Sequence, residues 1–180
     1  MPLEQLRPTE RKRVMDLVEQ AGIDVTPWSF TADGTPVAIP ASNPAYCYEW
    51  CFWNAERVVL SLWFDHMLVE EGRVIQRRNM RSLRRRIEQA NHLDPGTRTA
   101  NVRRAVAVDS AVQRAFKNKL PVHVIVCDGE RRILEDVESR DPSKVERRFL
   151  DLSPWQVMSY DYLGITTAGD AVIVRGEPID

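Results

Sequence analysis

Few side chains in this 180-residue chain have the type and spacing that a reaction requires. Asp128 and Glu130 lie two positions apart after an apolar stretch, and His92 lies near Asp94 in a polar segment. Paired carboxylates can hold a divalent metal, and a histidine can act as a general base. However, no lysine follows Glu130 in the register that a restriction-type nuclease uses, and Asp128-Gly129 is also typical of a hairpin turn. The chain also lacks Gly-rich phosphate loops, nucleophile elbows and zinc-protease motifs. These residues therefore favour a binding module over an enzyme, and predict no metal site and no cofactor.

The strongest feature of the chain is a block of positive charge. Residues 71–119 carry thirteen Arg or Lys and four Asp or Glu, whereas the rest of the chain carries twelve and twenty-two. The formal net charge of −1 conceals this division. Concentrated positive charge indicates an anionic partner, and nucleic acid is the commonest one. Arg outnumbers Lys by eleven to two in the block, which favours phosphate because a guanidinium binds it bidentately.

The block coincides with two predicted helices. Residues 78–90 have apolar side chains at helical spacing from Met80 to Ala90, and residues 100–118 have them from Val102 to Phe116. The cationic side chains on the opposite faces are the expected phosphate contacts: Arg77, Arg78, Arg81, Arg85, Arg103, Arg114 and Lys117. Two alternatives stay open, because these side chains could instead pair with the acidic surplus of the same chain or a second copy, or bind another anion.

Asp109 stands apart within the second helix. Its helical position places it on the apolar side, between Val102 and Phe116. A buried carboxylate needs a partner, so we expect one of the nearby arginines to pair with it.

Aromatic residues alternate just before the block. In a strand over residues 46–53, Tyr46, Tyr48, Trp50 and Phe52 share one face, and Trp63 follows in a second predicted strand over residues 57–65. Such a face either packs into the core or stacks on a base. The candidate base pocket consists of Tyr46, Tyr48, Trp50 and Trp63. On the other face, Glu49 is expected to point to solvent, and Cys47 and Cys51 lack the further ligands of a zinc site.

The same patterns predict the helices and strands that carry these residues. A helix is expected from Thr9 to Ala21, then a loop or arm over residues 23–44 and the aromatic hairpin. After the two basic helices come a buried strand over residues 120–127, a mixed stretch over residues 129–154, and a strand pair over residues 157–162 and 171–175. This order predicts an α+β fold with one globular domain over residues 1–180, a largely antiparallel sheet and about three helices.

Composition also bears on location. No apolar run reaches the ~18 residues of a membrane span, and residues 1–13 lack the apolar region of a secretory signal. Three cysteines cannot all pair, which favours a reducing cytoplasm.

Three segments carry a resemblance to known proteins: Ala41–Trp50, Leu120–Gly129 and Leu150–Trp155. In order and content they resemble bacterial proteins of poorly defined function, some of which look like DNA-reading modules of modification-dependent restriction systems. The resemblance implies recognition of a DNA feature, with cleavage by a separate nuclease subunit. We therefore predict a nucleic-acid-binding domain without catalytic activity of its own, with DNA favoured over RNA. The alternatives are a module that docks an acidic partner or forms homo-oligomers, and a small metal-dependent enzyme.

Overall fold

The fold was analysed in a computed structural model, which describes residues 3–130 and 144–177. It is α+β: seven strands form one sheet in the order β1-β2-β5-β6-β7-β4-β3, and every neighbouring pair is antiparallel except β2 and β5. The strands are β1 (Cys51–Trp53), β2 (Val58–Trp63), β3 (Leu68–Glu70), β4 (Arg73–Asn79), β5 (Val122–Glu130), β6 (Lys144–Tyr160) and β7 (Asp170–Arg175). The helices are α1 (Val14–Gln20), α2 (Met80–Gln89) and α3 (Pro95–Asn118), with short 3₁₀ turns at Leu3–Leu6, Thr26–Ser29, Pro40–Ser42 and Phe64–His66. The predicted fold class is confirmed.

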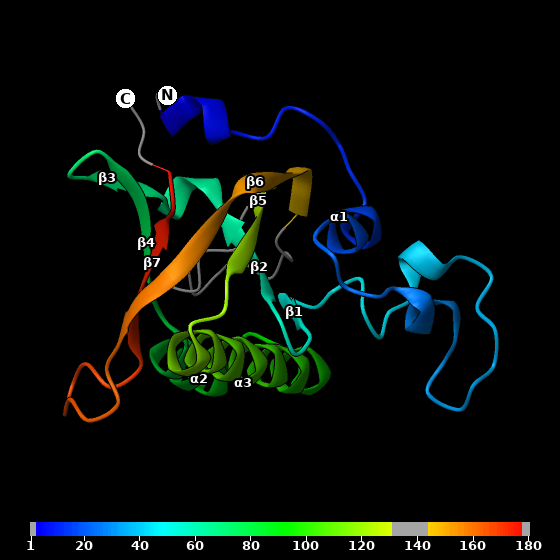
Figure 1. The fold of residues 1–180 in the computed structure, drawn as a ribbon. Coiled ribbons are helices and arrows are strands. Elements are labelled where there is room, and N and C mark those ends of the chain that lie inside the picture. The colour runs from blue at the N-terminus through cyan, green and yellow to red at the C-terminus, as the bar shows by residue number, and fades with distance from the viewer. Residues whose placement is uncertain (1–2, 131–143, 178–180) are drawn as a thin grey trace.

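Helices cover the two faces of the sheet unequally (Figure 1). The longer helices α2 and α3 lie together against one face, where Ile87 and Val108 pack with Leu60, Val124 and Trp155. On the other face, α1 and the segment that follows it cover only the part formed by β1, β2, β5 and the first half of β6. Strands β2 and β5 are therefore buried on both sides, which explains their almost continuous apolar sequences.

The first helix is shorter than expected. It begins at Val14, so Arg13 and not Thr9 is its N-cap residue, and Arg13 pairs with Asp16 at 2.8 Å. It ends as predicted, with Ala21 as the C-cap residue and Gly22 following at φ +88°, a backbone conformation that glycine adopts without strain.

The aromatic strand predicted over residues 46–53 is largely wrong, because only Cys51–Trp53 pair with β2. The buried side chain of Asn43 donates to the carbonyl oxygens of Trp28 (2.8 Å) and Phe30 (3.0 Å) and accepts from the N–H of Ala45 (3.0 Å). These bonds hold the chain in a turn through Tyr46 and remove the alternation that would have put four aromatic rings on one face.

The basic helices also differ in their boundaries. Asn79 is the N-cap of α2 and accepts from the N–H of Ser82 (2.8 Å), so Arg77 and Arg78 belong to β4 and not to a helix. Helix α3 begins five residues earlier than expected, at Pro95, because Asp94 caps it by accepting from the N–H of Thr97 (2.9 Å).

Strands β3 and β4 and the first part of β6 were not anticipated. The hairpin of β3 and β4 turns at Glu71-Gly72, where both residues have positive φ. The mixed stretch expected over residues 129–154 contains the first part of the long strand β6, and its residues 131–143 lie outside the described residues. Strand β5 continues past Asp128-Gly129 with a bulge, so the hairpin turn expected at that pair is wrong. The last strand pair, β6 with β7, is confirmed.

Candidate nucleic-acid interface

The helical layer, residues 80–118, concentrates positive charge on one side of the sheet. It carries nine Arg or Lys residues and three Asp or Glu residues. Apolar side chains such as Met80, Ile87 and Val112 are buried against the sheet. The charged side chains are therefore confined to the groove between α2 and α3 and to the outer surfaces of both helices.

Three of the seven predicted phosphate contacts pair with carboxylates of the same chain. Arg77 binds Glu70 at 2.8 Å, and Arg81 lies 3.5 Å from Asp109. Arg103 binds Glu49 through both of its terminal nitrogens. For these three residues, the alternative of internal pairing is what the structure shows.

Asp109 lies at the centre of a polar cluster between α3 and β6. Its Oδ1 accepts from the Tyr160 hydroxyl (2.6 Å), and its Oδ2 accepts from Gln113 (2.8 Å) and faces Arg81. Burial, followed by the hydrogen bond to this carboxylate, raises the pKa of Tyr160 above its usual value. The expectation that Asp109 has an arginine partner is confirmed.

Three other predicted contacts make no ion pair with any residue that the structure describes. Arg85, Arg114 and Lys117 are all exposed. Arg114 and Lys117 are three residues apart on α3 and share one face of that helix. The last predicted contact, Arg78, is half-buried on β4 with a terminal nitrogen 3.5 Å from Nδ1 of His66.

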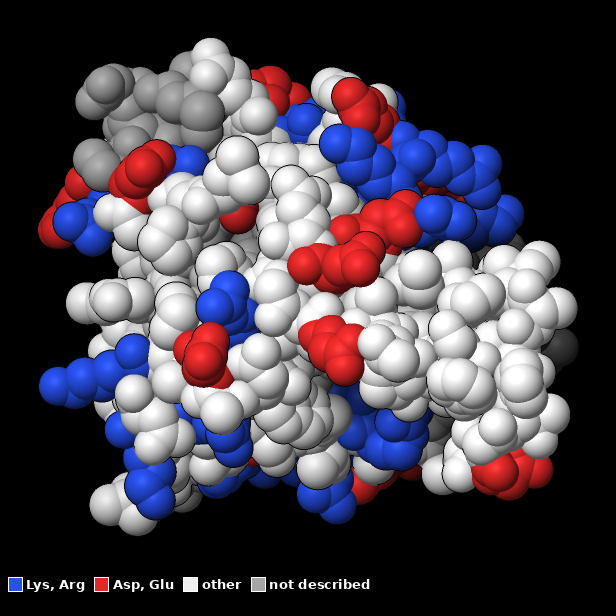
Figure 2. All heavy atoms as spheres, turned by 45° about the vertical axis from the view of Figure 1, so that its right-hand side comes forward, with Lys and Arg blue, Asp and Glu red and all other residues white. Residues whose placement is uncertain are grey.

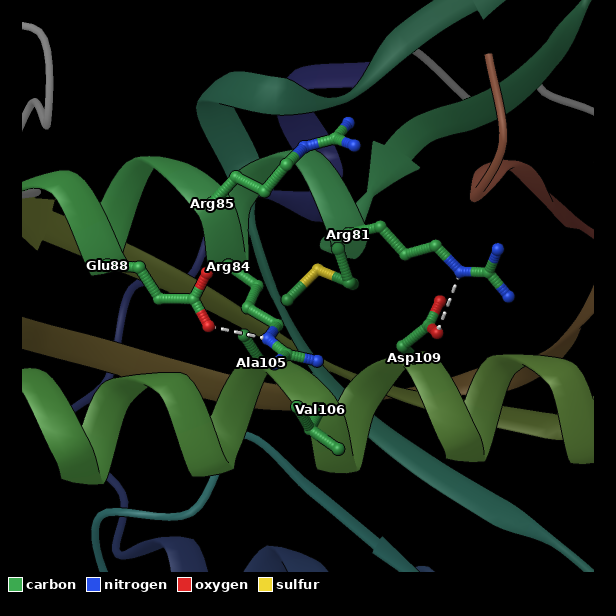
Figure 3. Close-up of a pocket in the computed structure, with 8 residues that line it drawn as sticks. Arg81, Arg84, Arg85, Glu88, Ala105, Val106 and Asp109 are labelled. Atoms are coloured by element: carbon green, nitrogen blue, oxygen red, sulfur yellow. Dashed lines mark hydrogen bonds and ion pairs between the residues drawn. The ribbon is translucent and has the colours of Figure 1, made fainter. Parts of the chain in front are cut away.

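An open pocket of about 460 Å³ lies between the charged side chains of α2 and α3 (Figure 3). Arg81 and Arg84 extend toward α3, where Arg81 meets Asp109, and Arg84 pairs with Glu88 at 2.8 Å. Arg85 points away from the pocket. Sequence reasoning missed Arg84 and Glu88, although their i, i+4 spacing is a usual signal for a helical ion pair.

The four residues of the proposed base pocket are dispersed. Tyr46 stacks on Trp28, with ring centroids 5.3 Å apart, on the side of the sheet that α1 covers, and Trp63 packs on the same side. Trp50 packs instead against the cluster beneath α2 and α3. Tyr48 is 62% exposed, with the Arg104 guanidinium 5.8 Å from its ring centroid. The structure does not bring these rings together.

Glu49 does not point freely to solvent, as the sequence suggested. Its side chain is 11% exposed and lies between Arg103 and Arg104. The segment that precedes Glu49 in the sequence, residues 25–48, carries one charged residue, Asp33. Figure 2 shows this segment as an almost uncharged lobe, whereas red and blue side chains are interleaved elsewhere on that view.

Of the residues considered for catalysis, Asp128 has structural partners. Asp128 lies between Arg7 (3.4 Å) and Arg147 (3.2 Å). Within residues 3–130 and 144–177, no three His, Cys, Asp or Glu side chains converge as metal ligands would. The thiols of Cys51 and Cys127 are free but buried, and burial raises their pKa values to about 12 and about 11.

Comparisons with protein-family models, curated proteins and solved structures gave no significant match. In the part of the chain that the structure describes, no helix has both the length and the apolar character needed to cross a bilayer. The charge and geometry of the helical layer are therefore the features of this protein that bear on its function.

Proposed function

We propose that the outer surface of α2 and α3 binds nucleic acid, with DNA favoured over RNA, and that the domain has no catalytic activity of its own. The observation that carries the proposal is the charge of the helical layer, nine basic against three acidic residues, with Arg85, Arg114 and Lys117 exposed and without acidic partners among the described residues. Three such cations on two packed helices suit a phosphate backbone, whose charges repeat along its length.

The internal ion pairs are compatible with phosphate binding because the carboxylates are less exposed than the arginines that they contact. The carboxylates of Glu49 and Asp109 are 11% and 16% exposed, whereas the side chain of Arg103 is 59% exposed. A phosphate that approaches α3 would therefore meet the guanidinium before the carboxylate. The acidic partner also fixes the orientation of the guanidinium, which lowers the entropy lost when a second anion binds.

A binding module of this kind would act with a separate effector, such as a nuclease subunit. Three free thiols, Cys47, Cys51 and Cys127, suit a reducing cytoplasm. Both statements extend the proposal and require their own tests, by capture of the effector and by fractionation of cells.

Charge reversal tests the proposal directly. We expect Arg85→Glu combined with Arg114→Glu to lower the affinity for a fluorescent DNA duplex by at least about tenfold, because two phosphate contacts become repulsions. The matched control is Arg11→Glu combined with Lys144→Glu, which changes the net charge equally at exposed residues outside the helical layer. Anisotropy titrations measure both affinities.

Two results would contradict the proposal. Equal losses in the two double variants would show that only overall charge matters. Unchanged DNA affinity with an altered oligomeric state in the α2–α3 variant would instead support the alternative, in which this surface docks a protein or a second copy.

A further inference from the structure

The loop between β6 and β7 exposes aliphatic side chains to an unusual degree. Leu163 is 92% exposed and Ile165 is 102% exposed, and the adjoining Tyr162 is 43% exposed. Figure 1 shows this loop extending beyond the ends of β6 and β7, on the side of the molecule where α2 and α3 pack. Single exposed apolar residues are common, but two at the tip of one projecting loop indicate a contact with another molecule.

Hydrogen bonds hold the loop in one conformation. Oδ1 of Asp161 accepts from the N–H groups of Leu163 and Gly164, both at 2.9 Å, and the N–H of Gly169 donates to the Asp161 carbonyl at 2.7 Å. Gly169 has φ +96°, where a side chain would be strained. The loop thus presents its aliphatic tip without requiring reorganisation when it binds.

The same loop is fixed to both basic helices. Asn79, the N-cap of α2, donates to the carbonyl of Ala168 at 3.2 Å, and the ring of Tyr162 lies 6.4 Å from that of Phe116 in α3. A Cβ on Gly169 would lie 3.0 Å from the Arg81 side chain, so the loop and the first turn of α2 are in close contact. Phe116 immediately precedes Lys117. The loop is therefore joined to the first turn of α2 and to the last turns of α3, which carry Lys117.

We propose that Leu163 and Ile165 form a wedge that enters between two base pairs of duplex DNA while the cations of α2 and α3 hold the flanking phosphates. Leucine and isoleucine are suited to this because an apolar side chain can replace the stacking contact that a kinked base step loses. The proposal rests on the proposed function and adds the form of DNA recognised, a duplex with a step that unstacks easily, such as TA or CA.

The arrangement favours DNA over a lipid surface. Arginines supply eight of the nine positive charges of the helical layer, and their planar groups match phosphates at fixed positions. Stable membrane attachment requires more buried apolar area than two aliphatic side chains provide. Binding to anionic vesicles is nevertheless an outcome that the experiment below can detect.

The test uses a duplex with 2-aminopurine at a central TA step, because the fluorescence of this base rises when it unstacks. We expect the wild-type protein to increase the signal at saturation. Leu163→Ser combined with Ile165→Ser should abolish the increase and weaken binding by roughly tenfold, since no apolar side chain then covers the unstacked step. The salt dependence should stay unchanged because the phosphate contacts remain.

The matched control is Leu152→Ser combined with Met158→Ser, which removes two exposed apolar side chains from β6. It should behave like the wild type. Saturable wild-type binding without a fluorescence increase would overturn the wedge while leaving the proposed function intact. If the wild type binds no DNA, both proposals fail. If it binds vesicles of phosphatidylserine and phosphatidylcholine through Leu163 and Ile165 instead, the wedge is overturned in favour of a membrane contact.

Discussion

The two buried cysteines illustrate how environment decides the chemistry of a single residue. A thiol reacts as its thiolate, so a raised pKa lowers its reactivity at neutral pH. Burial raises the pKa values of Cys51 and Cys127 to about 12 and about 11. Neither residue is therefore a candidate nucleophile or redox sensor in the folded protein.

This yields a prediction at the residue scale. At about pH 8, iodoacetamide should modify Cys51 and Cys127 of the native protein far more slowly than those of the unfolded chain, because an ordinary thiol has a pKa of about 8.5. Peptide mass spectrometry after timed labelling measures each site, and labelling in concentrated urea is the control. Native rates equal to unfolded rates would contradict the burial of these thiols.

The lowered pKa of His123 predicts how the stability of the folded protein changes with pH. Burial, and then the charge of Arg57, lower its pKa below the ordinary 6.5, so the folded protein takes up this proton less readily than the unfolded chain. Stability from this residue is complete above pH 6.5 and declines as pH falls from there toward the folded pKa. Urea unfolding of the wild type and of His123→Gln between about pH 5 and pH 8 measures it. As pH falls, the free energy of unfolding should decrease less in the variant than in the wild type. Identical pH profiles would contradict a lowered pKa of His123 as a cause of the decrease.

At the scale of elements, β6 shows why some of the fold could not be predicted. A strand is expected to bury its apolar alternate residues, but here Asp151 and Ser153 are buried while Leu152 is 78% exposed. The pattern inverts because Arg175 of β7 donates to Asp151 at 2.7 Å, and Trp155 donates to the same oxygen at 2.8 Å. No local sequence signal reveals a partner 24 residues away, so the part of β6 before residue 157 was not predicted.

The Asp151–Arg175 pair gives a prediction for the sheet. Asp151→Ala leaves a buried guanidinium without its counter-charge, which we expect to lower the free energy of unfolding by about 3–5 kcal/mol. Glu177→Ala is the matched control, because Glu177 also lies near Arg175 (3.6 Å) but is 72% exposed, and it should cost less than about 1 kcal/mol. Urea denaturation compares the two. A loss near that of the control would mean that the buried pair does not join β6 to β7.

Other elements were predictable because their signals are local. Helical spacing identified most of α2 and α3, and the apolar run identified β5. The strand predicted over residues 46–53 was largely wrong because three hydrogen bonds of the Asn43 side chain outweigh the strand preference of Tyr46 and Tyr48. In the same way, capping by Asp94 extended α3 beyond the apolar pattern that predicted it.

For the whole molecule, the sequence indicated a charged surface but not its internal balance. The count of basic residues correctly located positive charge on two helices that pack together. It could not show that three carboxylates pair with basic residues of the block. These ion pairs are Glu49 with Arg103, Glu70 with Arg77, and Asp109 with Arg81. The proposed interface is consequently smaller than the charge block, and depends most on Arg85, Arg114 and Lys117.

The salt dependence of DNA binding tests this claim most directly. Between ~50 and 200 mM salt, the logarithm of the wild-type binding constant should fall linearly with the logarithm of salt concentration, with a slope of about −0.9 for each phosphate contact. Arg85→Glu with Arg114→Glu removes two contacts and should reduce the magnitude of that slope by about 1.8. Arg11→Glu with Lys144→Glu should leave the slope unchanged. A slope near zero, or no binding at ~50 mM salt to either single- or double-stranded DNA, would contradict a phosphate-binding helical layer.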